Sequence, residues 1–242
     1  MIAFLFFSIY LFPIRITNLD IPFLIMFLSN NIFSSIFVLL CFLFVINGAN
    51  LIDGFNGLLA LNLIIINAIL AYINLVDGIN DFSIFIIGQI IILFSFLLFN
   101  FPIAKIFLGD SGSYLMGSLV ALNVIITNNL NPEYSSFFFC ILLFYLFFEV
   151  FFSFFRKIIQ KKSPLHPDNK HLHMLVFEKI SLIFGKKKGN YINSLIINLG
   201  YLSFVLPALI FAKDPIISRY WFFSLIIIYL VIYYRLYRLT KN

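Results

Sequence analysis

The residues best suited to chemistry lie in one polar turn between two apolar segments, FNFPIAKIFLGDSGS at 99–113. Asp110 precedes Ser-Gly-Ser, whose backbone amides would begin the next helix and could hold a phosphate. Mg²⁺ suits this position because it prefers hard oxygen ligands and is often bound through one or two carboxylates plus substrate phosphates. Lys105 can neutralise phosphate and Phe107 can present its ring to a base. The alternative is a polar turn that only joins two helices.

A second polar stretch, NGANLIDGFNGLLA at 47–60, interrupts the apolar sequence earlier in the chain. Asp53 is its only charge, Asn50 offers an amide donor and acceptor, and Gly54 and Gly57 allow the backbone to approach a ligand. A turn that ends one helix and caps the next is an equally good interpretation.

The third stretch, SPLHPDNKHLHMLVFEK at 163–179, holds all three histidines of the chain, His166, His171 and His173. A transition-metal site is one interpretation, but no Cys is near and an H-x-H pair does not share a helix face. Lys170 and two imidazoles favour anion binding, and a pyrophosphate would fit.

Composition predicts the fold class. The chain is 62% hydrophobic and 11% charged with 34 Phe, which leaves too little polar surface for a soluble globule. We expect an all-α, polytopic integral membrane protein forming a single membrane domain over 1–242, with one large loop at 156–190. Its first segment reads as a retained helix and not as a cleaved signal peptide. The eight expected spans are 1–12, 32–46, 57–75, 82–99, 113–127, 136–155, 191–212 and 217–234.

The basic residues predict the topology. With a cytoplasmic N-terminus, the inner regions 47–56, 100–112, 156–190 and 235–242 hold 13 of the 16 Lys and Arg, as the positive-inside rule requires. Asp53, Asp110 and Glu149 then lie at or inside the inner membrane ends, where an ionisable group is a functional candidate by default. The three polar motifs share this cytoplasmic face.

Taken in order, the three motifs resemble those of the polyprenyl-phosphate N-acetylhexosamine-1-phosphate transferases of glycosyltransferase family 4, relatives of the phospho-N-acetylmuramoyl-pentapeptide transferase. The resemblance implies transfer of N-acetylhexosamine 1-phosphate from a UDP-N-acetylhexosamine to polyprenyl phosphate, such as undecaprenyl phosphate. It implies Mg²⁺ as cofactor, with Mn²⁺ as the alternative, in the plasma membrane with a cytoplasmic active face. No nucleic acid is expected as a partner, and a homodimer is left open.

The resemblance also implies roles for individual residues. Asp110 matches the metal-binding Asp of the family, and Asp53 matches an acid of the same catalytic cleft. Substrate-binding roles follow for five residues: Phe107 on uracil, Asn100 lining the nucleotide site, and Asn50, Lys105 and Lys170. His171 and His173 match the histidine motif that engages the phosphates of the sugar nucleotide, and they complete the expected catalytic set.

Two departures from the family pattern shape the expectation. Met174 stands where a further His is common. The family has about eleven helices and an acidic DD motif before the fourth, whereas this chain has eight segments and no adjacent Asp pair. We therefore expect a shortened sequence of an active lineage that lacks three N-terminal helices. A partner supplying those helices, or a catalytically incomplete homologue acting as a binding or scaffold protein, is the alternative. A small transporter is disfavoured because the charges gather at one surface instead of the midplane.

Overall fold

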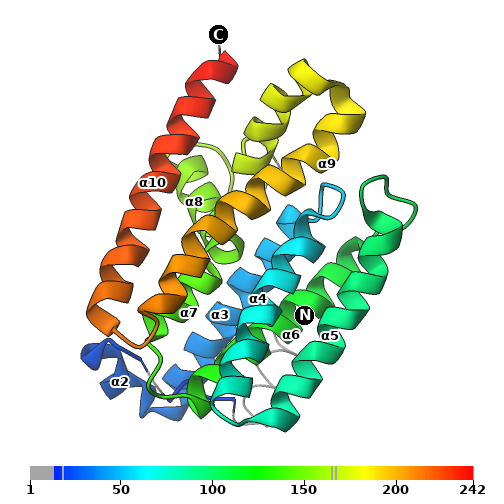
Figure 1. Cartoon of the computed structure of the whole chain (residues 1–242). Helices are drawn as coiled ribbons and strands as arrows, with labels where there is room; N and C mark the ends of the chain where they lie inside the picture. Colours follow the sequence, from blue (N-terminus) through cyan, green and yellow to red (C-terminus); the bar gives the residue numbers. More distant parts are fainter. Residues whose placement is uncertain (1–13, 18, 165, 167, 242) are drawn as a thin grey trace.

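The computed structural model describes residues 14–17, 19–164, 166 and 168–241, and within them it is a bundle of helices without strands (Figure 1). The expected segment 1–12 lies outside the described residues. The helices in chain order are α2 (Pro22–Leu28), α3 (Asn31–Ile52), α4 (Leu58–Val76), α5 (Asn80–Asn100), α6 (Gly109–Leu130), α7 (Ser136–Leu142), α8 (Phe144–Ile159), α9 (Leu172–Ile210) and α10 (Pro215–Lys241).

Six of these helices are long and apolar enough to cross a bilayer, namely α3, α4, α5, α6, α9 and α10, and the bent pair α7–α8 would make a seventh. Each expected span that falls within the described residues coincides with one of them. The chain is an all-α, polytopic membrane protein, as its composition predicts.

The span expected at 136–155 is not one straight helix. It breaks at Leu143, and α7 and α8 meet at 77°. The break could not be predicted from the sequence, because neither Gly nor Pro lies near Leu143. Packing accounts for the position of α8 instead: a Cβ on Gly48 of α3 would lie 2.1 Å from the backbone oxygen of Leu146, so only glycine permits this approach.

The segment 156–190, expected as a loop, is largely helical. The first part of α9 occupies its second half and turns at Gly185, whose φ of 75° breaks the helix before it returns through the bundle. Leu172, Leu175 and Ile180 are buried along this first part, which explains why it folds as a helix and not as a coil.

Buried amides join the spanning helices to one another. Asn123 of α6 donates to Asn67 of α4 at 3.1 Å and to Gln89 of α5 at 2.8 Å, and Asn62 of α4 donates to Asn198 of α9 at 3.3 Å. Interhelical hydrogen bonds of this kind satisfy polar groups that lipid cannot. They hold α4 at the centre of the bundle, between α5, α6 and α9.

Candidate active site

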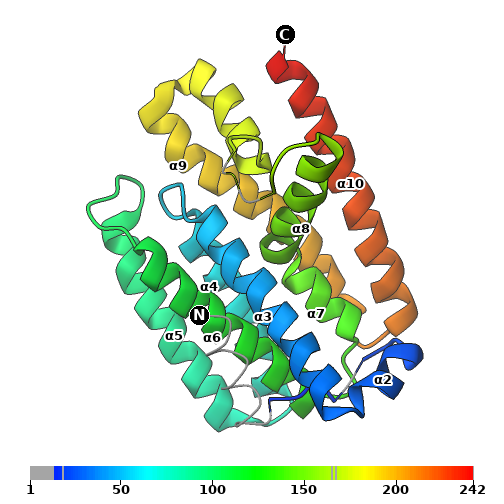
Figure 2. The ribbon, with the colours of Figure 1, turned by 180° about the vertical axis from the view of Figure 1, so that it is seen from behind.

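The polar motifs gather at one end of the bundle. The α3–α4 turn, the α5–α6 loop, the start of α9 and the C-terminal end of α10 lie at the upper end in Figure 1, and the view from behind agrees (Figure 2). The α4–α5 and α9–α10 turns lie at the opposite end. The expected clustering at one end is therefore present, and the assignment of that end to the cytoplasm stays a prediction.

Two carboxylates from different helices meet at this end. Asp53 ends α3 and Asp110 lies in the first turn of α6. Asn50, one turn before Asp53, donates its amide to Asp110 Oδ1 at 2.9 Å and to Ser113 Oγ at 3.1 Å. Burial and the nearby charge of Asp110 raise the pKa of Asp53 to about 7. The two groups are therefore close enough to repel each other, and a cation would relieve that repulsion.

The oxygens of this carboxylate pair fit Mg²⁺, which takes hard oxygen ligands and retains waters or substrate oxygens. Asp110 is exposed and Asp53 half-buried, so the remaining ligand positions can be filled from solution. Across the part of the chain that is described, no group of three or more His, Cys, Asp or Glu could hold a metal by itself. The pair is thus suited to an ion that arrives with a phosphate.

The α3–α4 turn is tied to the α5–α6 loop through Asn100. Its side-chain oxygen accepts from Gly57 N at 2.6 Å, and its amide donates to the backbone oxygen of Ile106 at 2.8 Å. Gly57 has φ of 76°, and a Cβ there would lie 2.8 Å from the Phe101 ring. Asn100 is buried, and both its amide groups bond within the protein; a role for it in nucleotide binding stays a prediction.

Lys105 and Phe107 project from the α5–α6 loop. Both side chains are exposed, and Phe107 is 74% exposed. An exposed aromatic ring in the loop that precedes Asp110 is available to stack on a planar ligand. Both side chains are accessible to a ligand, and their contacts with phosphate and uracil stay predictions.

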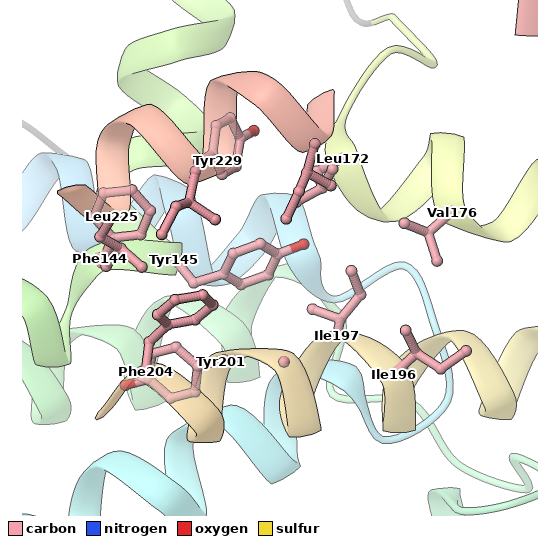
Figure 3. Close-up of a pocket in the computed structure, with 13 residues that line it drawn as sticks. Phe144, Tyr145, Leu172, Val176, Ile196, Ile197, Tyr201, Phe204, Leu225 and Tyr229 are labelled. Atoms are coloured by element: carbon pink, nitrogen blue, oxygen red, sulfur yellow. The ribbon is translucent and has the colours of Figure 1, made fainter. Parts of the chain in front are cut away.

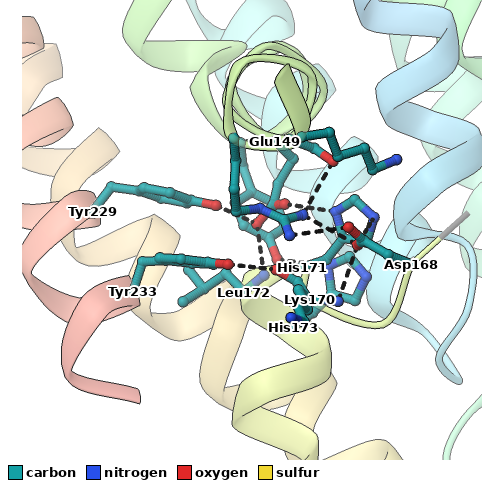
Figure 4. Close-up of polar contacts among 12 residues, drawn as sticks. Glu149, Asp168, Lys170, His171, Leu172, His173, Tyr229 and Tyr233 are labelled. Carbon is teal, nitrogen blue, oxygen red and sulfur yellow. Dashed lines mark hydrogen bonds and ion pairs between the residues drawn. The ribbon is translucent and has the colours of Figure 1, made fainter. Parts of the chain in front are cut away.

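His171 and His173 lie in a buried polar network at the start of α9, whereas His166 is exposed (Figure 4). His171 is the N-cap residue of α9; its Nδ1 lies 3.2 Å from Glu149 Oε2, and its Nε2 lies 3.6 Å from Asp168 Oδ1. His173 is fully buried, and its Nδ1 lies 3.2 Å from the Tyr145 hydroxyl. The two imidazole rings stack at 5.5 Å.

His173 connects this network to the carboxylate pair. Its ring meets the Phe55 ring edge-on at 5.7 Å, and Phe55 belongs to the same turn as Asp53. The Nε2 atom of His173 is buried without a hydrogen-bond partner among the described groups. A buried nitrogen left unpaired is a candidate to bind a ligand atom.

Lys170 takes a different direction from the one expected. Its ammonium lies 3.3 Å from the Tyr237 hydroxyl and 5.2 Å from the centre of that ring, so the side chain contacts α10. Its backbone N–H donates to Asp168, and its carbonyl accepts from Tyr233. The Lys170 side chain thus packs against α10, and its role in substrate binding stays a prediction.

Sequence reasoning named Glu149 of α8 as a functional candidate but gave it no role in the site, and it did not consider Arg156 of the same helix. Arg156 donates to both oxygens of Asp168, at 3.0 and 3.1 Å. Burial alone would raise the pKa of Asp168, but the bonds from Arg156 and the Lys170 backbone outweigh it and lower that pKa. Glu149 carried a usable signal, because an acid inside an apolar segment is a functional candidate. Its partners could not be read from the sequence.

An apolar cavity of about 200 Å³ lies against this network between α8, α9 and α10 (Figure 3). Tyr145 and Tyr229 belong to both: their rings line the cavity, and their hydroxyls bond to His173 and Glu149. The apolar wall limits solvent access to the polar groups behind it and so strengthens their hydrogen bonds.

Comparisons with known proteins agree with the motifs. The sequence model of glycosyl transferase family 4 matches residues 1–128. The chain is 34% identical over 148 residues to an undecaprenyl-phosphate alpha-N-acetylglucosaminyl 1-phosphate transferase of Thermotoga maritima, covering 60% of this chain and 44% of that protein. It is also similar to phospho-N-acetylmuramoyl-pentapeptide-transferases.

Two of these pentapeptide transferases match stretches of different length in this chain. That of Clostridium perfringens is 34% identical over 110 residues, or 46% of this chain and 35% of its own length. That of Staphylococcus saprophyticus is 31% identical over 180 residues, or 70% of this chain and 55% of its own length. The chain thus spans about half the length, or less, of these relatives. No solved structure is significantly similar to it.

Proposed function

The chain belongs to glycosyl transferase family 4, and we propose that it transfers N-acetylhexosamine 1-phosphate from a UDP-N-acetylhexosamine to polyprenyl phosphate. In this reaction a phosphate oxygen of the lipid attacks the β-phosphorus of the nucleotide sugar. The bond from that phosphorus to the UMP oxygen breaks, so UMP leaves and a polyprenyl diphospho-sugar forms. The names of the Thermotoga maritima and Clostridium perfringens relatives support this reaction class.

The observation that carries the proposal is the Asp53–Asp110 pair braced by Asn50 at the start of α6. These two carboxylates would hold Mg²⁺, or Mn²⁺ in its place. When bound, the ion would neutralise the diphosphate and stabilise the charge that develops on the leaving UMP. Asn50 keeps one oxygen of Asp110 fixed, which preserves the geometry of the pair when no substrate is present.

The other polar groups of the site then have distinct tasks. Lys105 would neutralise a phosphate oxygen, and the exposed Phe107 ring would stack on uracil. The unpaired Nε2 of His173 would bond to a phosphate oxygen of the donor. Two phosphorylated anions must approach each other, so fixed donors and cations matter more here than a covalent nucleophile. We place this site on the cytoplasmic face, where nucleotide sugars are available.

The test is release of UMP from UDP-N-acetylglucosamine with undecaprenyl phosphate, using the purified chain in lipid nanodiscs with and without Mg²⁺. We expect Mg²⁺-dependent UMP release that Asp110→Asn lowers about 100- to 1,000-fold. Asp81→Asn is the matched control, because Asp81 is an exposed acid in the first turn of α5 at the opposite end of the bundle. Release by Asp110→Asn at the rate of the wild type or of Asp81→Asn contradicts the proposed site.

A second result separates the enzyme from a binding protein. If the wild-type chain binds the UDP-sugar with Mg²⁺ but releases no UMP, it acts as a binding or scaffold protein and the proposed transfer is wrong. Binding is measured by isothermal titration calorimetry on the same nanodiscs.

A further inference from the structure

Glu149 lies at the centre of the buried network without belonging to any of the sequence motifs. It is 1% exposed and sits on the buried face of α8. Three groups from two other helices converge on its carboxylate: His171 Nδ1 at 3.2 Å, Leu172 N at 3.1 Å and the Tyr229 hydroxyl at 2.7 Å. A carboxylate that receives three contacts in an apolar setting fixes the groups that approach it.

The two oxygens of Glu149 have different tasks. Oε1 accepts from Leu172 N and Tyr229 Oη, so it satisfies a free N–H in the first turn of α9 and ties that turn to α10. Oε2 faces only His171 among the described contacts. An ionised carboxylate accepts and cannot donate, so the nitrogen facing it must carry the proton.

We propose that Glu149 is a positioning residue for the histidine pair: it fixes Nδ1 of His171 as the protonated nitrogen and anchors the start of α9 beside the Asp53–Gly57 turn. The link to catalysis rests on the proposed function. The effect on His171 rests on the geometry alone. Glu149 acts through His171 and does not need to touch a substrate.

The position of His171 matters because the His173 ring stacks on it and, in turn, contacts the turn that holds Asp53. Its ring lies parallel to that of His173 within 6°, and His173 meets the Phe55 ring of the Asp53 turn. A turned His171 would displace His173, whose Nε2 is the unpaired nitrogen at this junction. Orientation of a histidine by a buried carboxylate behind it is a common device in sites that must be preorganised.

Other charged groups around His171 do not replace Glu149. Asp168 faces the other ring nitrogen at 3.6 Å, but its carboxylate is held by the guanidinium of Arg156. Tyr145 bonds to His173. Glu149 is therefore the group that faces Nδ1.

The substitution Glu149→Gln separates the two tasks. The Gln carbonyl can take the place of Oε1 and keep the bonds from Leu172 and Tyr229, whereas its NH₂ group takes the place of Oε2. That NH₂ donates, so Nδ1 of His171 must become an acceptor and the proton must move to Nε2. The variant should keep its fold and change only the histidine.

The experiment is ¹⁵N NMR of histidine-labelled protein in nanodiscs, which is tractable because the chain has three histidines. His171 is assigned from the signal lost in His171→Asn. We expect a protonated Nδ1 in the wild type and in the control Glu133→Gln, a carboxylate variant at the opposite end of the bundle. Glu149→Gln should show an unprotonated Nδ1. Tyr229→Phe, which removes a donor to Oε1 only, should resemble the wild type.

Activity provides the second measurement. We expect Glu149→Gln to lower kcat for UMP release about 10- to 100-fold, a size typical of residues that orient a functional histidine. Glu149→Asp, which retains the charge, should recover part of that loss. Glu133→Gln should retain wild-type turnover.

Three outcomes would overturn the proposal. An unprotonated Nδ1 on wild-type His171 contradicts it even if Glu149→Gln fails to fold. A folded Glu149→Gln with Nδ1 still protonated contradicts the tautomer assignment, and unchanged kcat contradicts the role in the reaction. A wild-type chain without transfer activity defeats the proposed function instead, and the NMR result still decides what Glu149 does to His171.

Discussion

The carboxylate pair and the histidine network lie side by side at one end of the bundle, yet they are built in opposite ways. Asp110 is exposed and Asp53 half-buried, and the Asn50 side chain donates one hydrogen bond to the Asp110 carboxylate. Glu149 and His173 are almost completely buried, and the network around them draws on α8, α9 and α10. The carboxylate pair is accessible to solvent, whereas the histidine network is buried and held together by hydrogen bonds between helices.

This difference in solvent access fits two different functions, ion binding by the carboxylate pair and side-chain positioning by the histidine network. An open carboxylate pair can exchange waters for phosphate oxygens and so suits an ion that enters and leaves with a substrate. A closed network cannot exchange ligands cheaply, because burying an unpaired polar group costs free energy. It suits the task of keeping side chains in a fixed geometry. The Phe55–His173 contact joins the two regions.

The largest expected effect tests whether the open pair acts as one unit. Asp53→Asn and Asp110→Asn should each lower UMP release about 100- to 1,000-fold, or about 2.7–4 kcal/mol in transition-state stabilisation. The double variant should be little worse than either single variant, since both carboxylates hold one ion. Steady-state rates in nanodiscs measure this. Losses that multiply in the double variant would mean that the two groups act separately.

The next effect tests the close packing of α3, which carries Asn50 and ends at Asp53, against α8, which carries Glu149. Gly48→Ala should lower the free energy of unfolding by about 1–3 kcal/mol, because its Cβ would overlap the backbone oxygen of Leu146 where α8 crosses α3. Thermal unfolding in detergent measures the loss. Gly88→Ala in α5 is the control, since nothing lies within 4 Å of a Cβ there. Equal stability of the two variants would argue against the close α3–α8 contact.

Ligand-dependent stability distinguishes the regions directly. Mg²⁺ with UDP, at ten times the apparent Kd, should stabilise the wild type by about 1.4 kcal/mol. Asp110→Asn should abolish this gain, whereas Glu149→Gln should keep most of it, because the network does not hold the ion. Melting temperatures with Mg²⁺ and after EDTA treatment provide the measurement. A gain lost equally in both variants would show that the regions are not separable.

The smallest effect concerns Asp168 at the edge of the network. Its pKa is lowered in the folded protein, so the Arg156 pair contributes stability above the ordinary Asp pKa and loses it as the pH falls through the lowered value. Asp168→Asn should therefore cost about 1 kcal/mol between pH 5 and 8 and less below pH 4. Unfolding by denaturant across this range checks it. A destabilisation by Asp168→Asn that increases as the pH falls would contradict this prediction.

Much of the architecture could be predicted from local sequence. Apolar runs of sufficient length predicted the spans, and the distribution of polar motifs between them predicted that Asp53, Asp110 and the histidines lie at the same end. The Asn50–Asp110 bond and the Phe55–His173 contact agree with that clustering. The roles assigned to these residues stay predictions.

The sequence by itself therefore determined that the chain lies in a membrane, how many spans the described residues form, and that the polar motifs meet at one end of the bundle. It could do so because hydropathy and motif order are properties of neighbouring residues. Only the tertiary structure decided the bend at Leu143, the tie through Asn100 and the convergence of His171, Leu172 and Tyr229 on Glu149. The Asn100–Gly57 bond and the three contacts to Glu149 join residues that are 22 or more positions apart in the chain. Such contacts arise when helices pack, and no local pattern encodes them.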